Sequence, residues 1–285
     1  MKRDVLNGVI DKLSREHGMI VLLMSECGSR AWGLAIEDSD YDIRFIYYQL
    51  PWRKALEDNQ DTVRLSLEVE GVSLDLQGFD LRRAVLSIAS SNLAVIEMFS
   101  SPLRYVYDTV AVESLENAIP HYLRVGRLVD SLQGQTKRLW RTGPTNMMSP
   151  KHYQYVWRFA MMAEYARDTG KLWVNVEDLW QPGSVRTKMF AESRKFDNNQ
   201  FCNTMISIRT FDDKLLDHFK KSHFFEWLTI FVEEVLSMKV AHERREQMTE
   251  FMSAANEVFA VVCHYVHSAQ LNQKIVETNM LGDLK

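Results

Sequence analysis

The stretch that decides the fold is Ser25-Glu26-Cys27-Gly28-Ser29-Arg30-Ala31-Trp32-Gly33, followed shortly by the acidic segment Glu37-Asp38-Ser39-Asp40-Tyr41-Asp42. A continuous apolar run from Met19 to Met24 precedes it and is typical of a buried strand. Gly28 allows the backbone to pass close to a ligand, and Ser29 offers a hydroxyl. A helix opening here would point free amides at phosphate groups. The stretch therefore predicts a strand that leads into a phosphate-binding turn.

Acidic residues follow this turn on two predicted strands. Asp40 and Asp42 stand at the entry to a strand from Tyr41 to Tyr48. Residues two apart on a strand project from the same face, so both carboxylates can reach one or two magnesium ions. Asp75 lies between two leucines in a later strand, which predicts that its carboxylate points away from the core. Strand pairing would place Asp75 beside the first two acids, where it can deprotonate or orient an acceptor hydroxyl.

The turn and the three acids together suit one reaction. A hydroxyl would attack the α-phosphate of a nucleoside triphosphate in line and release pyrophosphate, while two metal ions neutralise the charge on the phosphate oxygens. Each feature alone has an ordinary explanation, because Gly-Ser is a common turn and lone acids often mark a solvated strand edge. Their order along predicted strands favours the catalytic interpretation.

The remaining periodicity predicts the fold class. In the first third of the chain we expect a helix from Leu6 to Leu13, a hairpin of strands Val63–Val69 and Val72–Phe79, a helix Leu81–Ala89 capped by Asp80, and a short helix from Ser91 or Asn92 to Phe99. Helical periodicity then predicts helices His121–Trp140, Lys151–Asp168, Asp212–Met238 and Glu243–Gln270. The predicted fold is α+β, with a mixed sheet and flanking helices in residues 1–110 and a mostly α-helical domain in residues 111–285.

The motifs carry a resemblance to a known family. Gly28-Ser29, Asp40-Tyr41-Asp42 and Leu74-Asp75-Leu76 follow the pattern of the minimal nucleotidyltransferases of the DNA polymerase β superfamily. Residues 28–35, 38–44, 75–81 and 96–102 are more closely similar to a predicted nucleotidyltransferase group found beside RNA ligases in bacteria and phages, although that group commonly carries tryptophan where Phe79 stands. The resemblance continues more faintly through residues 155–158. It implies a nucleotidyltransferase-type sheet, two Mg²⁺ or Mn²⁺ ions held by Asp40, Asp42 and Asp75, and an NTP such as ATP as substrate.

A second candidate region runs from His121 to Phe159. It carries seven basic residues (Arg124, Arg127, Lys137, Arg138, Arg141, Lys151, Arg158) against a single acid, Asp130, with aromatic residues between them. This composition suits phosphate contacts and base stacking, although aromatic residues at helical spacing also build cores. Lys151, Tyr155 and Arg158 would share one helix face and hold a nucleotide. The predicted nucleotide-binding residues are Gly28, Ser29, Arg30, Arg44, Lys151, Tyr155 and Arg158; for Arg30 and Arg44, surface ion pairs are an equally open interpretation.

Composition limits the partners. The net charge of −4 over 285 residues means that any nucleic-acid surface must be local. No apolar run approaches the ~20 residues of a membrane span, and the first residues lack a signal-peptide pattern, so we expect no membrane association and a cytoplasmic location. The three scattered cysteines, Cys27, Cys202 and Cys263, suggest neither disulfides nor structural zinc.

The predicted function is metal-dependent transfer of a nucleoside monophosphate from an NTP to a hydroxyl. The acceptor we expect is RNA, either tRNA or an RNA 3′ end under repair, with an RNA ligase as a possible partner. One alternative is transfer to a protein or a small molecule, as in antitoxin-type or antibiotic-modifying relatives. Another is a non-catalytic module that senses nucleotides or scaffolds RNA repair. Three converging carboxylates have no evident use in such a module, and they favour the enzyme.

Overall fold

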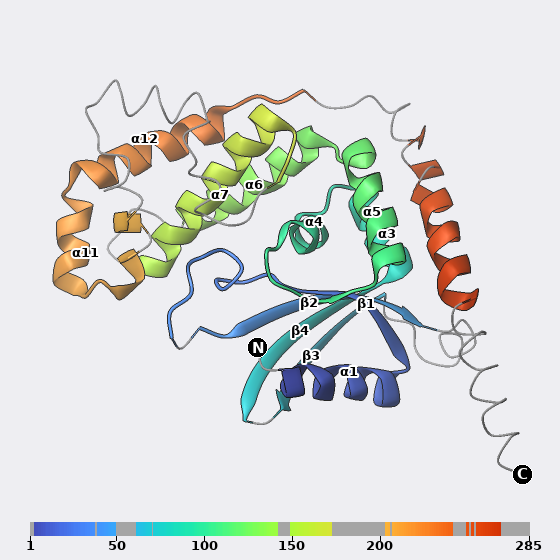
Figure 1. The fold of residues 1–285 in the computed structure, drawn as a ribbon. Helices are drawn as coiled ribbons and strands as arrows, with labels where there is room; N and C mark the ends of the chain where they lie inside the picture. Colours follow the sequence, from blue (N-terminus) through green and yellow to red (C-terminus); the bar gives the residue numbers. More distant parts are fainter. Residues whose placement is uncertain are drawn as a thin grey trace, which may run out of the picture.

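The computed structural model describes residues 3–37, 39–49, 61–69, 71–141, 149–172, 203–205, 207–241, 249–250, 252–253 and 255–268. Its elements are α1 (Arg3–His17), β1 (Met19–Glu26), β2 (Tyr41–Gln49), β3 (Thr62–Val69), β4 (Val72–Asp80), α3 (Leu81–Ala89), α4 (Leu93–Ser100), β5 (Arg104–Tyr107), α5 (Thr109–Tyr122), α6 (Val125–Arg141), α7 (Pro150–Thr169), η1 (Ile208–Thr210), α11 (Asp213–Lys220) and α12 (His223–Ser237). Residues 255–268 are also helical. The predicted α+β class, with a mixed sheet followed by helices, is confirmed (Figure 1).

The sheet has five strands in the order β3-β4-β2-β1-β5. Strands β2 and β4 are parallel, and the other neighbours are antiparallel. The predicted hairpin is present as β3 and β4, which join at Gly71 with a φ of 74°, a backbone conformation that favours glycine. The parallel register places Asp42 opposite Asp75. Two of the three predicted catalytic acids therefore lie side by side on the two parallel strands.

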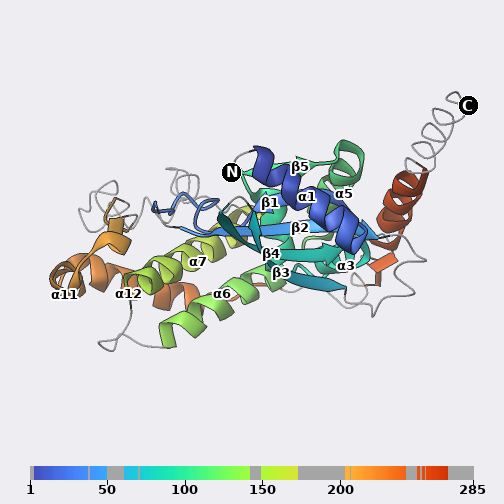
Figure 2. The same ribbon diagram turned by 90° about the horizontal axis from the view of Figure 1, so that it is seen from below.

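Alternation along β2 sends its side chains to two different layers. Ile43, Phe45 and Tyr47 pack with α1 in one hydrophobic cluster. Ile46 and Tyr48 belong to the larger cluster formed with helices α3 to α7 and α12. Figure 2 shows α1 on one face of the sheet, in front of the strands. Because residues two apart share a face, Asp42 and Arg44 project toward the helices.

The helices beyond the sheet share its core. The larger cluster runs from Leu22 and Ile46 in the sheet to Trp157 in α7 and Val232 in α12, and it also includes Val262. Figure 1 shows α6, α7 and α12 extending to one side, with the helix at 255–268 on the other side near α3 and α5. Helix α5 packs against α3 and β1, although the predicted boundary at residue 110 assigns most of it to the second domain. The domain division stays a prediction.

Two predicted helices are wrong in their bounds, and a third falls partly outside the described residues. The expected helix His121–Trp140 is interrupted, because Arg124 donates its backbone N–H to Ser91 Oγ at 2.6 Å and α6 begins only at the next residue. The expected helix Asp212–Met238 is two helices, separated at Lys221 and Ser222. Apolar spacing continues across both interruptions, so periodicity alone joins the segments. Of the expected helix Glu243–Gln270, residues 243–248, 251, 254 and 269–270 lie outside the described residues.

The expected N-terminal caps of α3 and α4 are present. Asp80 accepts the N–H of Arg82, and Asn92 rather than Ser91 caps α4 by accepting the N–H of Ala94. No described helix has the length and apolar character to span a membrane.

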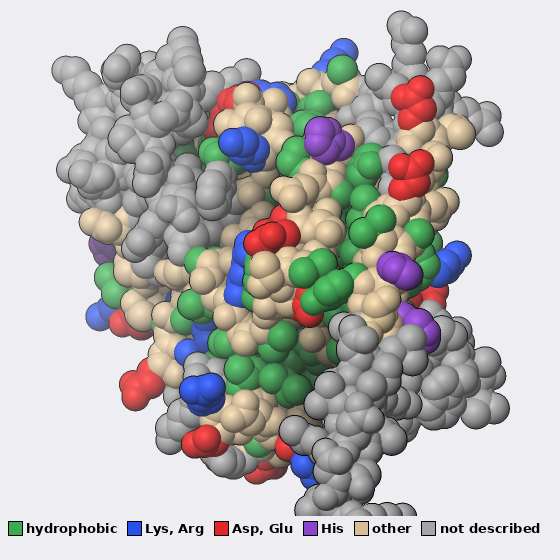
Figure 3. Space-filling model, turned by 45° about the vertical axis from the view of Figure 1, so that its right-hand side comes forward, with side chains coloured by type: hydrophobic (Ala, Val, Ile, Leu, Met, Phe, Trp, Pro, Cys, Tyr) green, Lys and Arg blue, Asp and Glu red, His purple; other side chains and the backbone are tan. Residues whose placement is uncertain are grey.

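On the face shown in Figure 3, Lys and Arg side chains are scattered among hydrophobic and other side chains. Among the described side chains on this face, no continuous band of positive charge is visible.

Candidate active site

The three predicted acids lie near one another at one end of β2. Asp42 and Asp75 are direct neighbours on parallel strands roughly 4.8 Å apart. Asp40 directly precedes β2, and all three residues are exposed. Partial burial and the negative charges of Asp40 and Asp75 raise the pKa of Asp42. As the side chains stand, no three His, Cys, Asp or Glu residues of the described chain are grouped closely enough to hold a metal ion.

Gly28 lies directly against Asp42. A Cβ built on Gly28 would be 1.8 Å from Asp42 Oδ2 and 2.6 Å from its Cβ, so a larger residue would displace the acid. The N–H of Cys27 also donates to the carbonyl of Asp42 at 2.8 Å. Residues 29–33 form turns where a helix opening was expected, with the N–H of Trp32 donating to Gly28 O. The turn and the start of β2 thus form one compact unit.

Glu26 is a site residue that sequence reasoning missed. It is fully buried at the end of β1, where Oε1 accepts the backbone N–H of Asp42 and Oε2 accepts the Tyr105 hydroxyl, both at 2.8 Å. Burial raises the pKa of Glu26, although these two hydrogen bonds act in the opposite direction. The feature of the sequence that could have indicated Glu26 is an acidic residue at the end of a mostly apolar strand. Through this hydrogen bond, Glu26 fixes the position of the Asp42 backbone.

Arg30 holds the loop that carries Asp40. Its Nε and Nη2 donate to the carbonyl of Ser39 at 3.2 and 2.5 Å, and Nε also reaches the carbonyl of Asp40 at 3.3 Å. Its guanidinium carbon lies 4.2 Å from the centre of the Tyr41 ring. Buried Ser39, which sequence reasoning also missed, accepts the N–H of Ile36. In this structure Arg30 therefore contacts the protein backbone, and its contact with a triphosphate stays a prediction.

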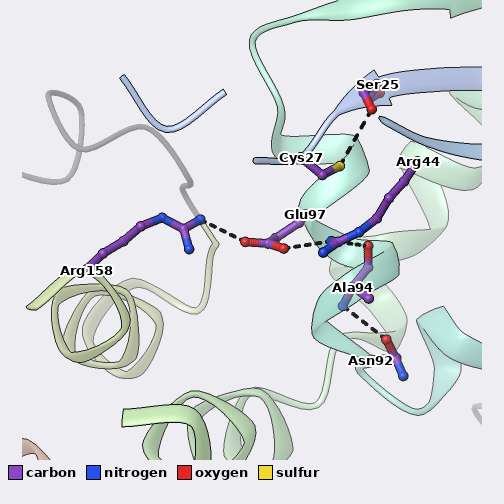
Figure 4. Close-up of polar contacts among 7 residues, drawn as sticks. All are labelled: Ser25, Cys27, Arg44, Asn92, Ala94, Glu97 and Arg158. Carbon is purple, nitrogen blue, oxygen red and sulfur yellow. Dashed lines mark hydrogen bonds and ion pairs between the residues drawn. The ribbon is translucent and has the colours of Figure 1, made fainter. Parts of the chain in front are cut away.

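A buried ion triad joins β2 to the helices (Figure 4). Glu97 of α4 is 4% exposed and pairs with Arg44 at 2.8 Å and with Arg158 of α7 at 2.7 Å. Burial alone would raise the pKa of Glu97, but the positive charges of Arg158 and Arg44 outweigh it and hold this pKa below its usual value. Glu97 is therefore ionised at neutral pH. Sequence reasoning missed its role, although one acid within an apolar helix, Leu93–Ser100, was the signal.

The predicted residues of α7 do lie along one side of the helix. Lys151 Nζ is 5.5 Å from the centre of the Tyr155 ring. Tyr155 meets the Trp32 ring edge to face at 5.3 Å, and the Arg158 guanidinium lies 3.6 Å from the centre of that ring. Burial increases along this face of α7, from exposed Lys151 through half-buried Tyr155 to fully buried Arg158. The Lys151 charge also lowers the pKa of Asp42, so the exposed end of this helix face lies within electrostatic reach of Asp42.

Comparison with known proteins agrees with the motifs. Residues 1–195 match RlaP, the RNA repair pathway DNA polymerase beta family. The chain belongs to this family. The chain is also 29% identical to YcgL of Bacillus subtilis (strain 168), which is described as an uncharacterized protein. That alignment covers 58% of this chain and 64% of YcgL, so the chain spans less than two thirds of this relative.

Membership in the RlaP family confirms the predicted resemblance. The matched residues include the whole sheet, α3 to α7 and all of the predicted site residues. The family is of the nucleotidyltransferase type and is associated with RNA repair. The roles of individual residues in this RlaP-family chain stay predictions.

Proposed function

We propose that this RlaP-family chain transfers a nucleoside monophosphate from an NTP to a hydroxyl of RNA and releases pyrophosphate. The observation that carries the proposal is the pairing of Asp42 with Asp75 on parallel strands, beside a turn where a side chain on Gly28 would collide with Asp42. Both acids are exposed toward the helical side of the sheet, where substrates can enter. The family description supports RNA as the acceptor.

The donor set fits a divalent cation such as Mg²⁺ or Mn²⁺. Asp40 and Asp75 both raise the pKa of Asp42, so the three carboxylates repel one another, and a cation would relieve that repulsion. Because all three side chains are exposed, rotation about their side-chain bonds can bring them together without moving the core. Two bound ions would supply charge neutralisation at the reacting phosphate.

The chain's own residues have separate tasks in this proposal. Asp75 accepts the proton of the acceptor hydroxyl, while Gly28 and Ser29 present the turn to the triphosphate. Glu26 and Arg30 position Asp42 and Asp40 through backbone hydrogen bonds. The Lys151 charge acts on Asp42, and in this proposal it binds a phosphate oxygen beside that acid.

The test is a transfer assay with the full-length protein. Each α-labelled NTP is incubated with magnesium or manganese and with RNA, protein or small hydroxyl acceptors in separate reactions. We expect label in RNA bearing a free 3′ hydroxyl, and a loss of about 10²-fold or more in Asp42→Asn and Asp75→Asn. The matched control is Asp11→Asn, which removes an exposed acid on α1, across the sheet from the site.

Two outcomes would overturn the proposal. Label that appears only in protein or only in a small molecule would replace RNA as the acceptor. NTP binding without transfer to any acceptor would replace the enzyme with a nucleotide-binding module. Binding of NTP is measured by calorimetry in the same buffer, so that failure to bind is distinguished from failure to react.

A further inference from the structure

A pocket of about 1030 Å³ opens between α4, α6 and α7. None of the three catalytic acids lines it, so it is distinct from the carboxylate site. Its walls combine basic, amide and aromatic groups, notably Arg44, Asn92, Arg127, Gln135, Arg138 and Phe159. Of the seven basic residues in the predicted region from His121 to Phe159, Arg127 and Arg138 line this pocket. Arg44 comes from the sheet, more than 80 residues away in sequence.

Arg44 lines the pocket, and only one of its three side-chain nitrogens donates a hydrogen bond to a described residue. Its Nη1 donates to Ala94 O at 3.0 Å and to Glu97 at 2.8 Å. Among the described residues, its Nε and Nη2 have no acceptor, and the side chain remains 23% exposed. Glu97 is neutralised from both sides by Arg44 and Arg158, so positive charge exceeds negative charge in this triad. A planar guanidinium with free donors suits a phosphate group.

Helix α6 adds two exposed arginines along the opposite wall. Arg127 and Arg138 are eleven residues apart, which corresponds to three helical turns and roughly 16 Å, so they share one face of the helix. Arg127 has no hydrogen bond or ion pair with any residue that the structure describes, and Arg138 donates to Gln135. Asp130 is the one acid of α6 that also lines the pocket. The separation of the arginines suits a ligand with several phosphates in a row.

The pocket lies beside the reaction centre. Arg44 follows Asp42 by two residues on the same face of β2, which places them about 7 Å apart along the strand. The Gly28 turn lies at the Asp42 end of β2, and Arg44 lies further along the strand toward its other end. A phosphate bound by Arg44 would therefore be within one nucleotide of a hydroxyl at Asp42 and Asp75, on the side away from the turn.

We infer that this pocket binds the phosphodiester backbone of the acceptor RNA next to its reactive hydroxyl, an assignment that rests on the proposed function. Arg44 binds the phosphate nearest the reaction centre, and Arg127 and Arg138 bind phosphates further along the strand. The half-buried ring of Phe159 in the wall offers a surface on which a base can stack. The incoming NTP binds on the other side of the acids, next to the Gly28 turn.

The experiment measures RNA and nucleotide binding separately. Fluorescence anisotropy with a labelled short single-stranded RNA compares the wild-type protein with the double variant Arg127→Gln/Arg138→Gln over a range of salt concentrations. The matched control, Arg15→Gln/Arg83→Gln, removes two exposed arginines of α1 and α3 and has the same net charge. We expect the pocket variant to bind RNA about tenfold more weakly and to lose about 1.4 from its salt slope, with ATP affinity unchanged. The control should bind RNA as the wild type does.

The outcomes separate this inference from the proposed function. If RNA is labelled in the transfer assay and the pocket variant binds RNA as tightly as the control, the pocket assignment is overturned while the proposed function stands. If RNA binding depends on Arg127 and Arg138 but no NMP transfer occurs, the assignment stands and the proposed function fails. A variant that loses ATP affinity and keeps RNA affinity would assign the pocket to the nucleotide, which contradicts the inference. Circular dichroism checks that each variant keeps its helices.

Discussion

Gly28 shows how closely the turn and β2 approach each other. Replacing it with alanine would drive a methyl group into both the carboxylate and the Cβ of Asp42, so the acid and its backbone must shift. Because a displacement of about 1 Å at a reaction centre costs on the order of 10²-fold in rate, we expect Gly28→Ala to reduce NMP transfer by at least that factor. The measurement is the transfer rate at saturating NTP.

The control for this substitution is Gly134→Ala in α6. Apart from the two neighbouring residues and the nearby backbone of α6, no described atom lies within 4 Å of the Cβ that alanine would add there. An alanine in a helix interior is preferred over glycine by up to about 1 kcal/mol, so this variant should unfold at slightly higher urea and keep its activity. Equal transfer rates in the two variants would contradict the role given to Gly28.

The protonation of Asp42 offers a second test at the residue scale. Its raised pKa arises from partial burial first and then from the charges of Asp40 and Asp75. The folded state therefore holds this proton more tightly than the unfolded chain does. The ionised form weakens the fold at neutral pH, and this effect disappears as the pH falls through the raised pKa.

We expect Asp40→Asn to lower the pKa of Asp42, because it removes the neighbouring charge that has the larger effect on this pKa. Carboxyl carbon chemical shifts, followed by NMR across an acid titration of the metal-free protein, give this pKa directly. An Asp42 titration curve that is the same in the variant and the wild type would contradict the proximity of the two acids.

At the scale of elements, the Glu97 triad connects the sheet to α4 and α7. Glu97→Gln would leave Arg158, which is fully buried, beside a neutral amide. Removing one partner of a buried ion pair costs about 3–5 kcal/mol, and we expect that loss in the free energy of unfolding in urea. Asp11→Asn, which breaks an exposed ion pair with Arg15 on α1, should cost no more than about 0.5 kcal/mol. Similar losses in both variants would contradict the structural role of the triad.

The same triad predicts a pH dependence of stability. The folded-state pKa of Glu97 is lowered, chiefly by the charge of Arg158 acting against burial. Its contribution is therefore fully present above the ordinary glutamate pKa of about 4.3 and is lost as the pH falls through the lower folded value. Urea unfolding at a series of acidic pH values should show this loss in the wild type and a weaker one in Glu97→Gln.

At the scale of the whole molecule, the shared core predicts joint unfolding. One hydrophobic cluster contains residues of β1, β2, α3 to α7 and α12, so the sheet cannot lose its cover without exposing that core. We expect tryptophan fluorescence, to which Trp157 and Trp227 of the helices contribute, to change at the same urea concentration as far-ultraviolet circular dichroism. Two separated transitions would indicate independent domains and would support the predicted division at residue 110.

Local patterns predicted much of the fold. The apolar run of β1, the hairpin of β3 and β4, and the caps Asp80 and Asn92 depend on neighbouring residues, so they were visible in the sequence. The interruptions at Arg124 and at Ser222 were not predicted. Arg124 donates to Ser91, which is remote in sequence, and periodicity carries no information about such a partner.

The sequence by itself determined the family, because the order Gly-Ser, Asp-x-Asp and a later acid is a local pattern that can be read directly along the chain. Only the tertiary structure decided which groups surround those acids. Glu26 beneath Asp42, the Glu97 triad, and the pocket that joins Arg44 to Arg127 and Arg138 all combine residues from different elements. Such contacts depend on how helices pack across the sheet, which no local spacing specifies.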